Sequence, residues 1–222
     1  MRTEAQGSAS PEFDHNPPVD QALDTRAQPD PGDTEHWQPL PSIAERLTAG
    51  RRLRQRVPRR SLAQLTAGAR DPLGILNEQN ATRVPELVPL RAQRMAESPF
   101  AFYRGTAAIM AADLANDPHS TIVVPACGDA HLANFGFYAS PQQTLVFDLN
   151  DFDEAAWAPW EWDLKRLVTS IIIAGQATSL DAQVTDAAAL AAVRAYALTL
   201  RASTRLSPRQ RYYTHFDAEA GL

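Results

Sequence analysis

Residues 123–167 read VVPACGDAHLANFGFYASPQQTLVFDLNDFDEAAWAPWEWDLKRL, and the rest of the chain is interpreted around this stretch. An apolar run at 121–124 is typical of a strand, and it ends shortly before the Gly-Asp-Ala-His sequence of residues 128–131. A second apolar run, at 144–147, is also typical of a strand and ends at a group of aspartates. We expect the two strands to form a small hairpin-like pair with polar side chains at their ends.

Four polar side chains around these strands are candidate metal ligands or catalytic groups. Asn134 follows Asp129 by five residues, and Asp148 and Asp151 follow the second apolar run. Carboxylate and amide oxygens suit Mg²⁺, which takes few carboxylates and otherwise water and phosphate oxygens. Asp148 comes directly after the strand and Asp151 lies in the turn beyond it, so either aspartate is a candidate for the metal ligand.

Phosphoryl transfer uses residues of these types in this order. One carboxylate accepts the proton of the attacking hydroxyl, and an asparagine and a second aspartate hold the metal on the nucleotide phosphates. Asp129 fits the first role, Asn134 fits the second, and Asp151 or Asp148 fits the third. The pattern predicts an ATP- and Mg²⁺-dependent phosphotransferase that acts on a small-molecule hydroxyl. His131 either takes part in this site or orients the loop by hydrogen bonding.

Two segments resemble those of known phosphotransferases. CGDAHLANFG, at 127–136, resembles the H-G-D-x-H-x-x-N loop of aminoglycoside phosphotransferases and choline kinases. DFDEAAWAPWEWDLKRL, at 151–167, resembles the segment in which their metal-binding aspartate precedes an acidic-aromatic turn and a helix that begins Asp-Leu. The resemblance favours Asp151 over Asp148. It implies a mostly helical α+β fold similar to the larger, C-terminal lobe of a protein-kinase-like fold, with a small β-hairpin carrying the site.

From about Val57 to Tyr196 the chain also resembles DUF2252, a bacterial family of unknown function. Four segments carry this resemblance: RMAESPFAFYRGTAAIMAADLA, CGDAHLANFGFYAS, VFDLNDFDEA and WEWDLKRL. Longer members of that family carry a G-x-G-S-x-G-like segment and a Lys-Glu-Ala segment nearer the C-terminus. The resemblance therefore implies a truncated member, incomplete at its C-terminus, that is inactive by itself.

Two other functions remain open. One is a non-catalytic binding module that keeps the fold and its cleft. No lysine precedes Asp129 and the glycines before it are isolated, which favours such a module. A phosphotransferase uses a Gly-rich hairpin and a lysine on the phosphates. A metal-dependent phosphoesterase is suggested by Gly-Asp-x-His but needs further histidines. The remaining histidines lie in no matching motif: His15, His36, His119 and His215.

Several cations and aromatic residues are candidates for binding the nucleotide. Arg104, beside Gly105, and Lys165, the only lysine, are the first candidates for the phosphates, ahead of Arg91 and Arg94. Three tryptophans follow the acidic turn and either line a slot for the base or fill the core below that turn. They are Trp157, Trp160 and Trp162.

Composition limits the class of protein. The 222 residues are 44% hydrophobic, as in ordinary globular domains, and the net charge of −5 gives no overall basic footprint for nucleic acid. No run approaches the roughly 18–20 apolar residues of a membrane helix, and residues 1–10 lack the apolar core of a signal peptide. We expect a cytoplasmic protein without a membrane span.

Cys127 is the only cysteine, and its position favours a buried thiol at a strand end over a nucleophile.

The chain is expected to contain a tail and one domain. Residues 1–40 hold six prolines and eight acidic residues, so a disordered acidic tail is predicted there. Residues 41–222 are expected to form a single, mainly helical domain. Seven arginines lie between 46 and 60. This run is either a patch for nucleic acid or another acidic partner, or a solvated helix face that neutralises the tail.

Capping residues and apolar spacing predict the helices. Leu87, Leu90 and Met95 form the expected buried side of the helix at 85–96. The Ala-rich helix at 181–201 is expected to be buried against the one before it, and no closing element is expected after 207. The other predicted helices begin at Ser42, at Asp71-Pro72, at Ser98-Pro99 (running to about 115) and at Asp163 (running to about 175).

Overall fold

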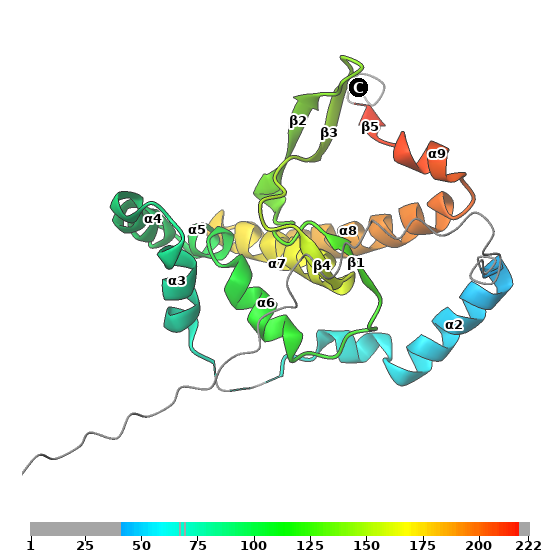
Figure 1. Ribbon diagram of the computed structural model, residues 1–222, viewed down its shortest axis with the longest axis horizontal. Coiled ribbons are helices and arrows are strands. Elements are labelled where there is room, and N and C mark those ends of the chain that lie inside the picture. Colours follow the sequence, from blue (N-terminus) through cyan, green and yellow to red (C-terminus); the bar gives the residue numbers. More distant parts are fainter. Residues whose placement is uncertain (1–40, 67, 69, 218–222) are drawn as a thin grey trace, which may run out of the picture. The chain divides into compact units, whose positions relative to one another are not determined.

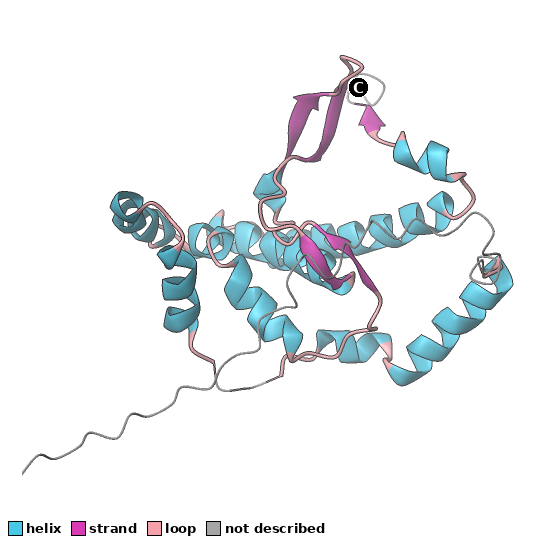
Figure 2. Ribbon diagram, viewed as in Figure 1, coloured by secondary structure: helices cyan, strands magenta, loops and turns pink. Residues whose placement is uncertain are grey.

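The computed structural model describes residues 41–66, 68 and 70–217, and the predicted tail at 1–40 lies outside them. Their fold is α+β and mostly helical, with two small antiparallel sheets (Figures 1 and 2). The chain divides into two compact units, Met1–Arg46 and Leu47–Leu222. Every element after α2 belongs to the second unit. No helix in the described residues has the length and apolar character needed to cross a membrane.

The first helices begin where their capping residues predict. α2 (Ile43–Arg56) starts with a capping box in which the Glu45 amide donates to Ser42 Oγ and the Ser42 amide donates to Glu45 Oε2. α3 (Pro72–Ala81) starts after Asp71, whose carboxylate accepts the Gly74 amide. Between them lies the short 3₁₀ helix η2 (Arg59–Ala63).

The helix expected at 85–96 consists of η3 (Pro85–Leu87) and α4 (Val88–Met95). Its buried side was only partly predicted, because Met95 is buried but Leu87 and Leu90 are 57% and 43% exposed. Both leucines line an open pocket, described below, which accounts for their exposure.

The helix expected from Ser98 to about 115 is broken in two. Ser98 caps α5 (Pro99–Arg104), and α6 (Ala107–Ala115) follows after Gly105. Arg91 Nη2 donates to the Gly105 carbonyl, and a Cβ on Gly105 would lie 2.7 Å from Met95 Sδ. The break between α5 and α6 therefore lets α4 approach the backbone at Gly105 closely.

Both predicted strands exist, but they do not form a pair. β1 (Val123–Ala126) pairs antiparallel with β4 (Ala156–Pro159). β3 (Leu145–Leu149) forms a hairpin with β2 (Phe135–Ala139). The true partners were missed because β2 is interrupted by Gly136 and β4 ends in proline, and both are weak strand signals.

The end of the described chain does contain a closing element, contrary to the prediction. Ser207 and Gln210 form a capping box at the start of α9 (Pro208–Tyr212). β5 (Phe216–Asp217) then pairs with β3 and completes a three-stranded sheet in the order β2-β3-β5. A two-residue strand such as β5 has no recognisable sequence pattern of its own, because it is defined by its pairing with a distant strand.

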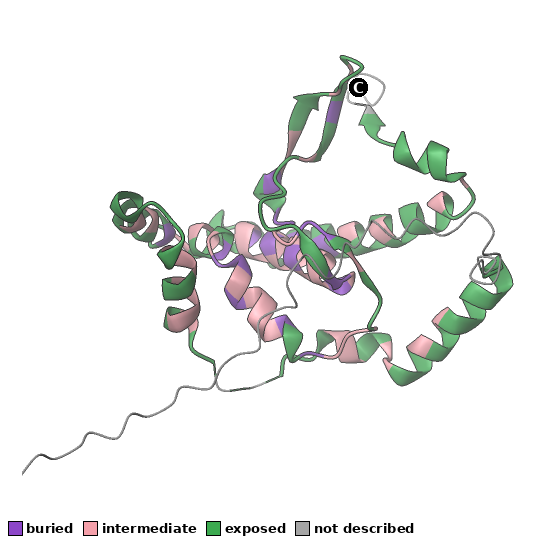
Figure 3. Cartoon of the chain, viewed as in Figure 1, coloured by how far each residue is buried: buried purple, intermediate pink, exposed green. Residues whose placement is uncertain are grey.

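The core lies around α7 (Glu161–Ala177), where buried residues concentrate (Figure 3). α7 begins two residues before the predicted start and packs against α5 and α8 (Ala182–Ser203). In α8, only Thr185 and Ala189 are buried, so the prediction that this helix is buried holds for only one part of it. Gly175 of α7 faces Thr185 there, and a Cβ on Gly175 would lie 2.4 Å from Thr185 Oγ1.

Gly175→Ala is expected to destabilise the fold by about 1–3 kcal/mol, because overpacking outweighs the helix propensity gained from alanine, up to about 1 kcal/mol. Denaturant unfolding of Gly175→Ala, Thr185→Ala and the double variant measures this effect. Thr185→Ala removes the clashing oxygen and methyl group, so the double variant should lose less stability than the sum of the single variants. Strict additivity would show that the helices do not meet at this point.

Candidate functional site

The turn after β1 places Asp129. Gly128 has φ 83°, which favours glycine, and a Cβ there would lie 1.9 Å from the Glu154 carbonyl oxygen. Asp163, near the start of α7, accepts the amide of Cys127 at 2.7 Å and the amide of Gly128 at 3.0 Å. The carboxylate of Asp163 therefore holds the turn, a role that its sequence position as a helix start did not reveal.

Arg166 fixes the side chain of Asp129. Arg166 is 2% exposed, and its Nε donates to Asp129 Oδ1 at 2.7 Å. Its Nη2 donates to the Tyr103 carbonyl at 2.6 Å, and its guanidinium lies 3.9 Å from the centre of the Tyr103 ring. The Tyr103 hydroxyl donates back to the Arg166 carbonyl at 2.8 Å. Oδ2 of Asp129 makes no hydrogen bond to another described residue.

His131 lies beside this free oxygen, with Nε2 3.6 Å from Asp129 Oδ2. His131 is 3% exposed, and burial lowers the pKa of its imidazole. The negative charge of Asp129 opposes this change in the His131 pKa, whereas the charges of Arg166 and Arg104 add to it. Its Nδ1 is buried and has no hydrogen-bond partner in the described structure. The neutral ring therefore helps to shape the loop and leaves Oδ2 of Asp129 accessible.

Asn134 ends the short 3₁₀ helix η4 (Leu132–Asn134). Its Nδ2 donates to the Asp129 carbonyl at 2.8 Å, and its amide oxygen makes no hydrogen bond to another described residue. The Leu132 amide donates to Ser170 Oγ of α7. Asp163, Arg166 and Ser170 thus lie at positions i, i+3 and i+7 of one helix and hold three points of the loop. A polar stripe at this spacing on a largely apolar helix was the signal for these supporting residues.

Asp148 and Asp151 lie in different places. Asp148 is within β3, exposed, and its Oδ1 accepts the Leu149 amide. Asp151 lies beyond the strand, where its carbonyl accepts from Cys127 Sγ at 3.4 Å and its Oδ1 accepts the Asp153 amide. Of the two aspartates, Asp151 lines the pocket described next and Asp148 does not.

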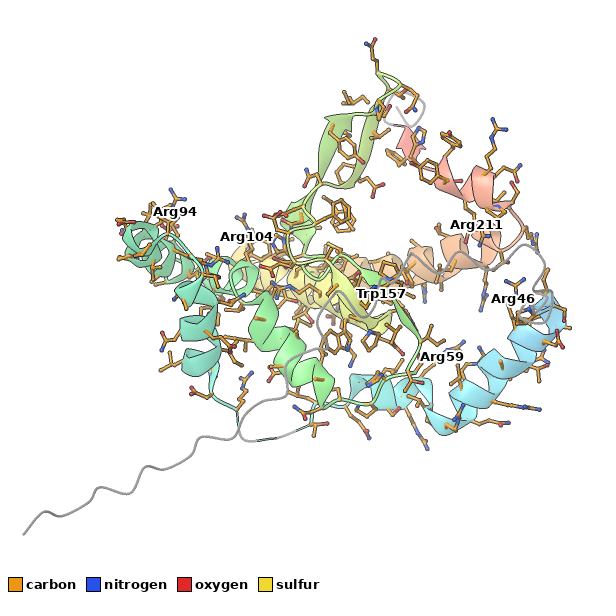
Figure 4. The ribbon with its side chains drawn as sticks, in the orientation of Figure 1. Arg46, Arg59, Arg94, Arg104, Trp157 and Arg211 are labelled. Carbon is orange, nitrogen blue, oxygen red and sulfur yellow. The ribbon has the colours of Figure 1, made fainter. Side chains whose placement is uncertain are left out.

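A pocket of about 910 Å³ brings together Asp129, His131, Asn134 and Asp151. Four arginines share its lining, and Figure 4 labels two of them on α4 and α5. They are Arg83, Arg91, Arg94 and Arg104. A smaller pocket of about 230 Å³ shares several of these residues and is also lined by Asp153 and Glu154. Side chains of both charges therefore face the same space.

Most of these charges have no partner. Arg91 donates to the Gly105 carbonyl, and burial lowers its pKa, with the positive charge of Arg83 adding to the effect. Within the described part of the chain, the side chains of Arg83, Arg94 and Arg104 form no ion pair. The same is true of three acidic side chains of the pocket lining: Asp151, Asp153 and Glu154.

Other sequence candidates lie outside this lining. Lys165 Nζ is 3.4 Å from Asp117 Oδ2, and Asp117 also accepts the Thr66 amide. Trp160 stacks on Tyr196 and donates to Ser120 Oγ, and Trp157 is exposed. None of the three tryptophans belongs to the lining of the larger pocket.

In the described residues, no three His, Cys, Asp or Glu side chains are grouped so that they could hold a metal ion. The pocket offers two carboxylates and one amide oxygen, from Asp129, Asp151 and Asn134. Such a donor set suits only a cation that completes its shell with water or ligand oxygens, as Mg²⁺ does.

Comparison with known proteins identifies the family. Residues 83–221 match the family described as "Uncharacterized protein conserved in bacteria (DUF2252)", which is more than half of the chain. The chain belongs to the DUF2252 family. The DUF2252 match includes the aspartates, the asparagine and the four arginines of the pocket lining. No curated protein and no solved structure matches the chain.

Gly128→Ala is expected to cost roughly 2–4 kcal/mol of unfolding free energy, because it combines an unfavourable φ with an overlap on the Glu154 carbonyl. Gly136→Ala is the control. Its Cβ would meet Asn150 Nδ2, the end of an exposed side chain that can move away. Denaturant unfolding of both variants measures the difference, and equal losses would contradict this account of the turn.

The Cys127 thiol is expected to react slowly in the native protein. Burial raises its pKa, and the carboxylates of Asp163, Asp129 and Asp151 raise it further. Labelling with Ellman's reagent at pH 8 should be at least about tenfold slower than in the guanidinium-unfolded chain. A Cys127→Ser, Gln142→Cys variant, whose thiol lies on an exposed loop, is the control. Equally fast labelling of native Cys127 would show that it is not buried.

Proposed function

We propose that this protein is a Mg²⁺-dependent phosphotransferase with a kinase-like fold, which transfers a phosphoryl group from ATP to the hydroxyl of a small molecule. One observation supports the proposal above others. Carboxylates and an amide oxygen share a pocket with arginines that have no ion-pair partner among the described residues. A metal-bound polyphosphate needs both kinds of group, because the metal takes oxygen ligands and the phosphates take cations.

The donors in the pocket fit Mg²⁺. Asp151 supplies a carboxylate and Asn134 an amide oxygen that is free because its nitrogen is bonded to the Asp129 carbonyl. Asp153 and Glu154 lie near enough to share the lining of the smaller pocket. When bound, Mg²⁺ neutralises the charge that develops on the transferred phosphoryl group.

Asp129 is the proposed base. Its Oδ1 is held by Arg166, so the carboxylate cannot rotate freely, and its Oδ2 has no hydrogen-bond partner among the described residues. This oxygen accepts the proton of the acceptor hydroxyl and orients that hydroxyl toward the phosphorus. His131 limits the space beside Oδ2 and keeps the loop in this conformation.

The arginines take the place of the missing lysine. Lys165 is paired with Asp117 outside the pocket, whereas Arg91 and Arg104 lie in the lining of both pockets together with Asp129. A guanidinium binds two phosphate oxygens at once, so these side chains can hold the non-transferred phosphates in a fixed orientation.

A non-catalytic binding module is the second candidate, and the pairing of Lys165 favours it. The only lysine of the chain is held away from the pocket, and positioning of the phosphates accounts for much of the rate in phosphoryl transfer. A phosphoesterase has less support, because His119 and His215 are the other described histidines and neither lines the pocket.

Calorimetry with Mg-ATP tests the metal assignment. Asp151→Asn should abolish binding of Mg-ATP, whereas Asp148→Asn, which removes an exposed carboxylate outside the pocket, should leave most of it. The reverse ranking would show that Asp148 is the ligand. A wild-type chain that does not bind Mg-ATP would contradict the proposed function for this chain by itself, and it is the result that the truncation implied by the family resemblance predicts.

Release of ADP then separates catalysis from binding. Asp129→Asn should lower ATP turnover at least about 100-fold, as loss of a general base does, with Mg-ATP binding retained. Lys165→Met is the control and should change turnover little. If the wild-type chain binds Mg-ATP and releases no ADP, either with water alone or with a panel of small-molecule alcohols supplied as acceptors, the protein is a binding module.

A further inference from the structure

A second cluster of charge lies away from the pocket residues, in the segment from Arg51 to Arg60. Six of its ten residues are arginine: Arg51, Arg52, Arg54, Arg56, Arg59 and Arg60. The first four lie on α2 and the last two on η2, where Figure 4 labels Arg59. We call these six residues the arginine segment.

The arginine segment is exposed, and no carboxylate among the described residues pairs with it. All six side chains are exposed, and α2 contains no buried residue. Among the described residues, no carboxylate forms an ion pair or hydrogen bond with any of them. The three described pairs that join a lysine or arginine to a carboxylate involve other cations: Arg70, Lys165 and Arg166. The cluster therefore does not serve to neutralise charge within the described structure.

The density of this charge matches that of a nucleic-acid duplex. Residues 51–56 carry four arginines over five helical steps, which is about 7.5 Å of axis, or roughly one charge per 2 Å. Duplex DNA carries one negative charge per roughly 1.7 Å of its axis. Arginine, unlike lysine, can also bind two oxygens of one phosphate in a fixed geometry.

The arrangement of the arginines around α2 favours a groove over a flat surface. At about 100° per residue, the four α2 residues of the arginine segment cover roughly 200° of the helix circumference, and Arg46, near the start of α2, is not among them. Leu53 and Val57, which lie on the remaining side, are half-buried. A helix that lies on a bilayer needs a free apolar face to insert. Beside the arginines the apolar residues are already partly covered, whereas Ile43 and Leu47, nearer the start of α2, are exposed.

We propose that the arginine segment binds duplex DNA through its phosphates, with α2 lying in the major groove. A helix of about 10–12 Å diameter fits this groove, which is about 12 Å wide, and phosphates flank it on both sides. Arginines on opposite sides of α2 then each meet a phosphate wall. The binding is independent of base sequence and independent of the phosphotransferase site.

Fluorescence anisotropy of the full 222-residue chain with a labelled 20-base-pair duplex tests the proposal. The logarithm of the binding constant should fall with the logarithm of salt concentration with a slope of about −4 to −5, for five phosphates contacted at about −0.9 each. Replacing Arg51, Arg52, Arg54 and Arg56 by Gln should weaken binding at least about tenfold at 50 mM salt and reduce the slope by about 3 to 4.

Two further variants control for charge and for folding. Replacing Arg201, Arg205, Arg209 and Arg211 by Gln makes the same charge change at other exposed positions, one of which Figure 4 labels on α9, and should leave DNA binding unchanged. Replacing the four α2 arginines by Lys should keep the salt slope. Far-ultraviolet circular dichroism checks that each variant retains its helices.

Three outcomes would overturn the proposal. The wild-type chain does not bind the duplex at 50 mM salt, or both sets of Gln substitutions weaken binding equally, or the chain binds phosphatidylserine vesicles but not DNA. The last result would identify an anionic membrane surface as the partner. Binding of Mg-ATP is measured separately, so failure of one proposal leaves the other untouched.

Discussion

The ion pair between Arg166 and Asp129 is the interaction on which the rest of the site depends. Arg166 is almost fully buried, and its guanidinium joins three parts of the chain: α7, the loop after β1 and the carbonyl of Tyr103 on α5. Removing one member of a buried pair leaves an uncompensated charge and typically costs about 3–5 kcal/mol. The arrangement of the loop is therefore tied to the core of the fold.

Because of this ion pair, the two carboxylate oxygens of Asp129 have different surroundings. Oδ1 accepts from Arg166, which fixes the side chain. Oδ2 lies 3.6 Å from His131 Nε2 and makes no hydrogen bond to another described residue, so it is the oxygen assigned to the proposed base. Asp163 and Ser170 accept hydrogen bonds from backbone amides of the same loop. Within the loop, the side-chain amide of Asn134 donates to the Asp129 carbonyl. The loop is thus positioned by hydrogen bonds that do not use the groups proposed to react.

Local sequence patterns predicted the features that depend on neighbouring residues, such as helix caps. They did not predict pairing between segments that are far apart in the chain. Ser42, Asp71 and Ser98 cap helices as expected, because a cap bonds to amides two or three residues away. The pairing of β1 with β4 joins residues that are 30 to 36 positions apart, and nothing near β1 indicates its partner. The polar stripe on α7 marks Arg166 as a supporting residue, but it does not identify Asp129, 37 residues away, as the partner.

The two pockets are lined by side chains of both charges, and within the described residues few of them form ion pairs. Burial lowers the pKa of Arg91, the positive charge of Arg83 adds to this effect, and the negative charge of Glu154 opposes it. A ligand carrying both a cation and several anionic oxygens satisfies the aspartates and the arginines together. The proposed function would therefore account for charged side chains that form no ion pair within the described part of the chain.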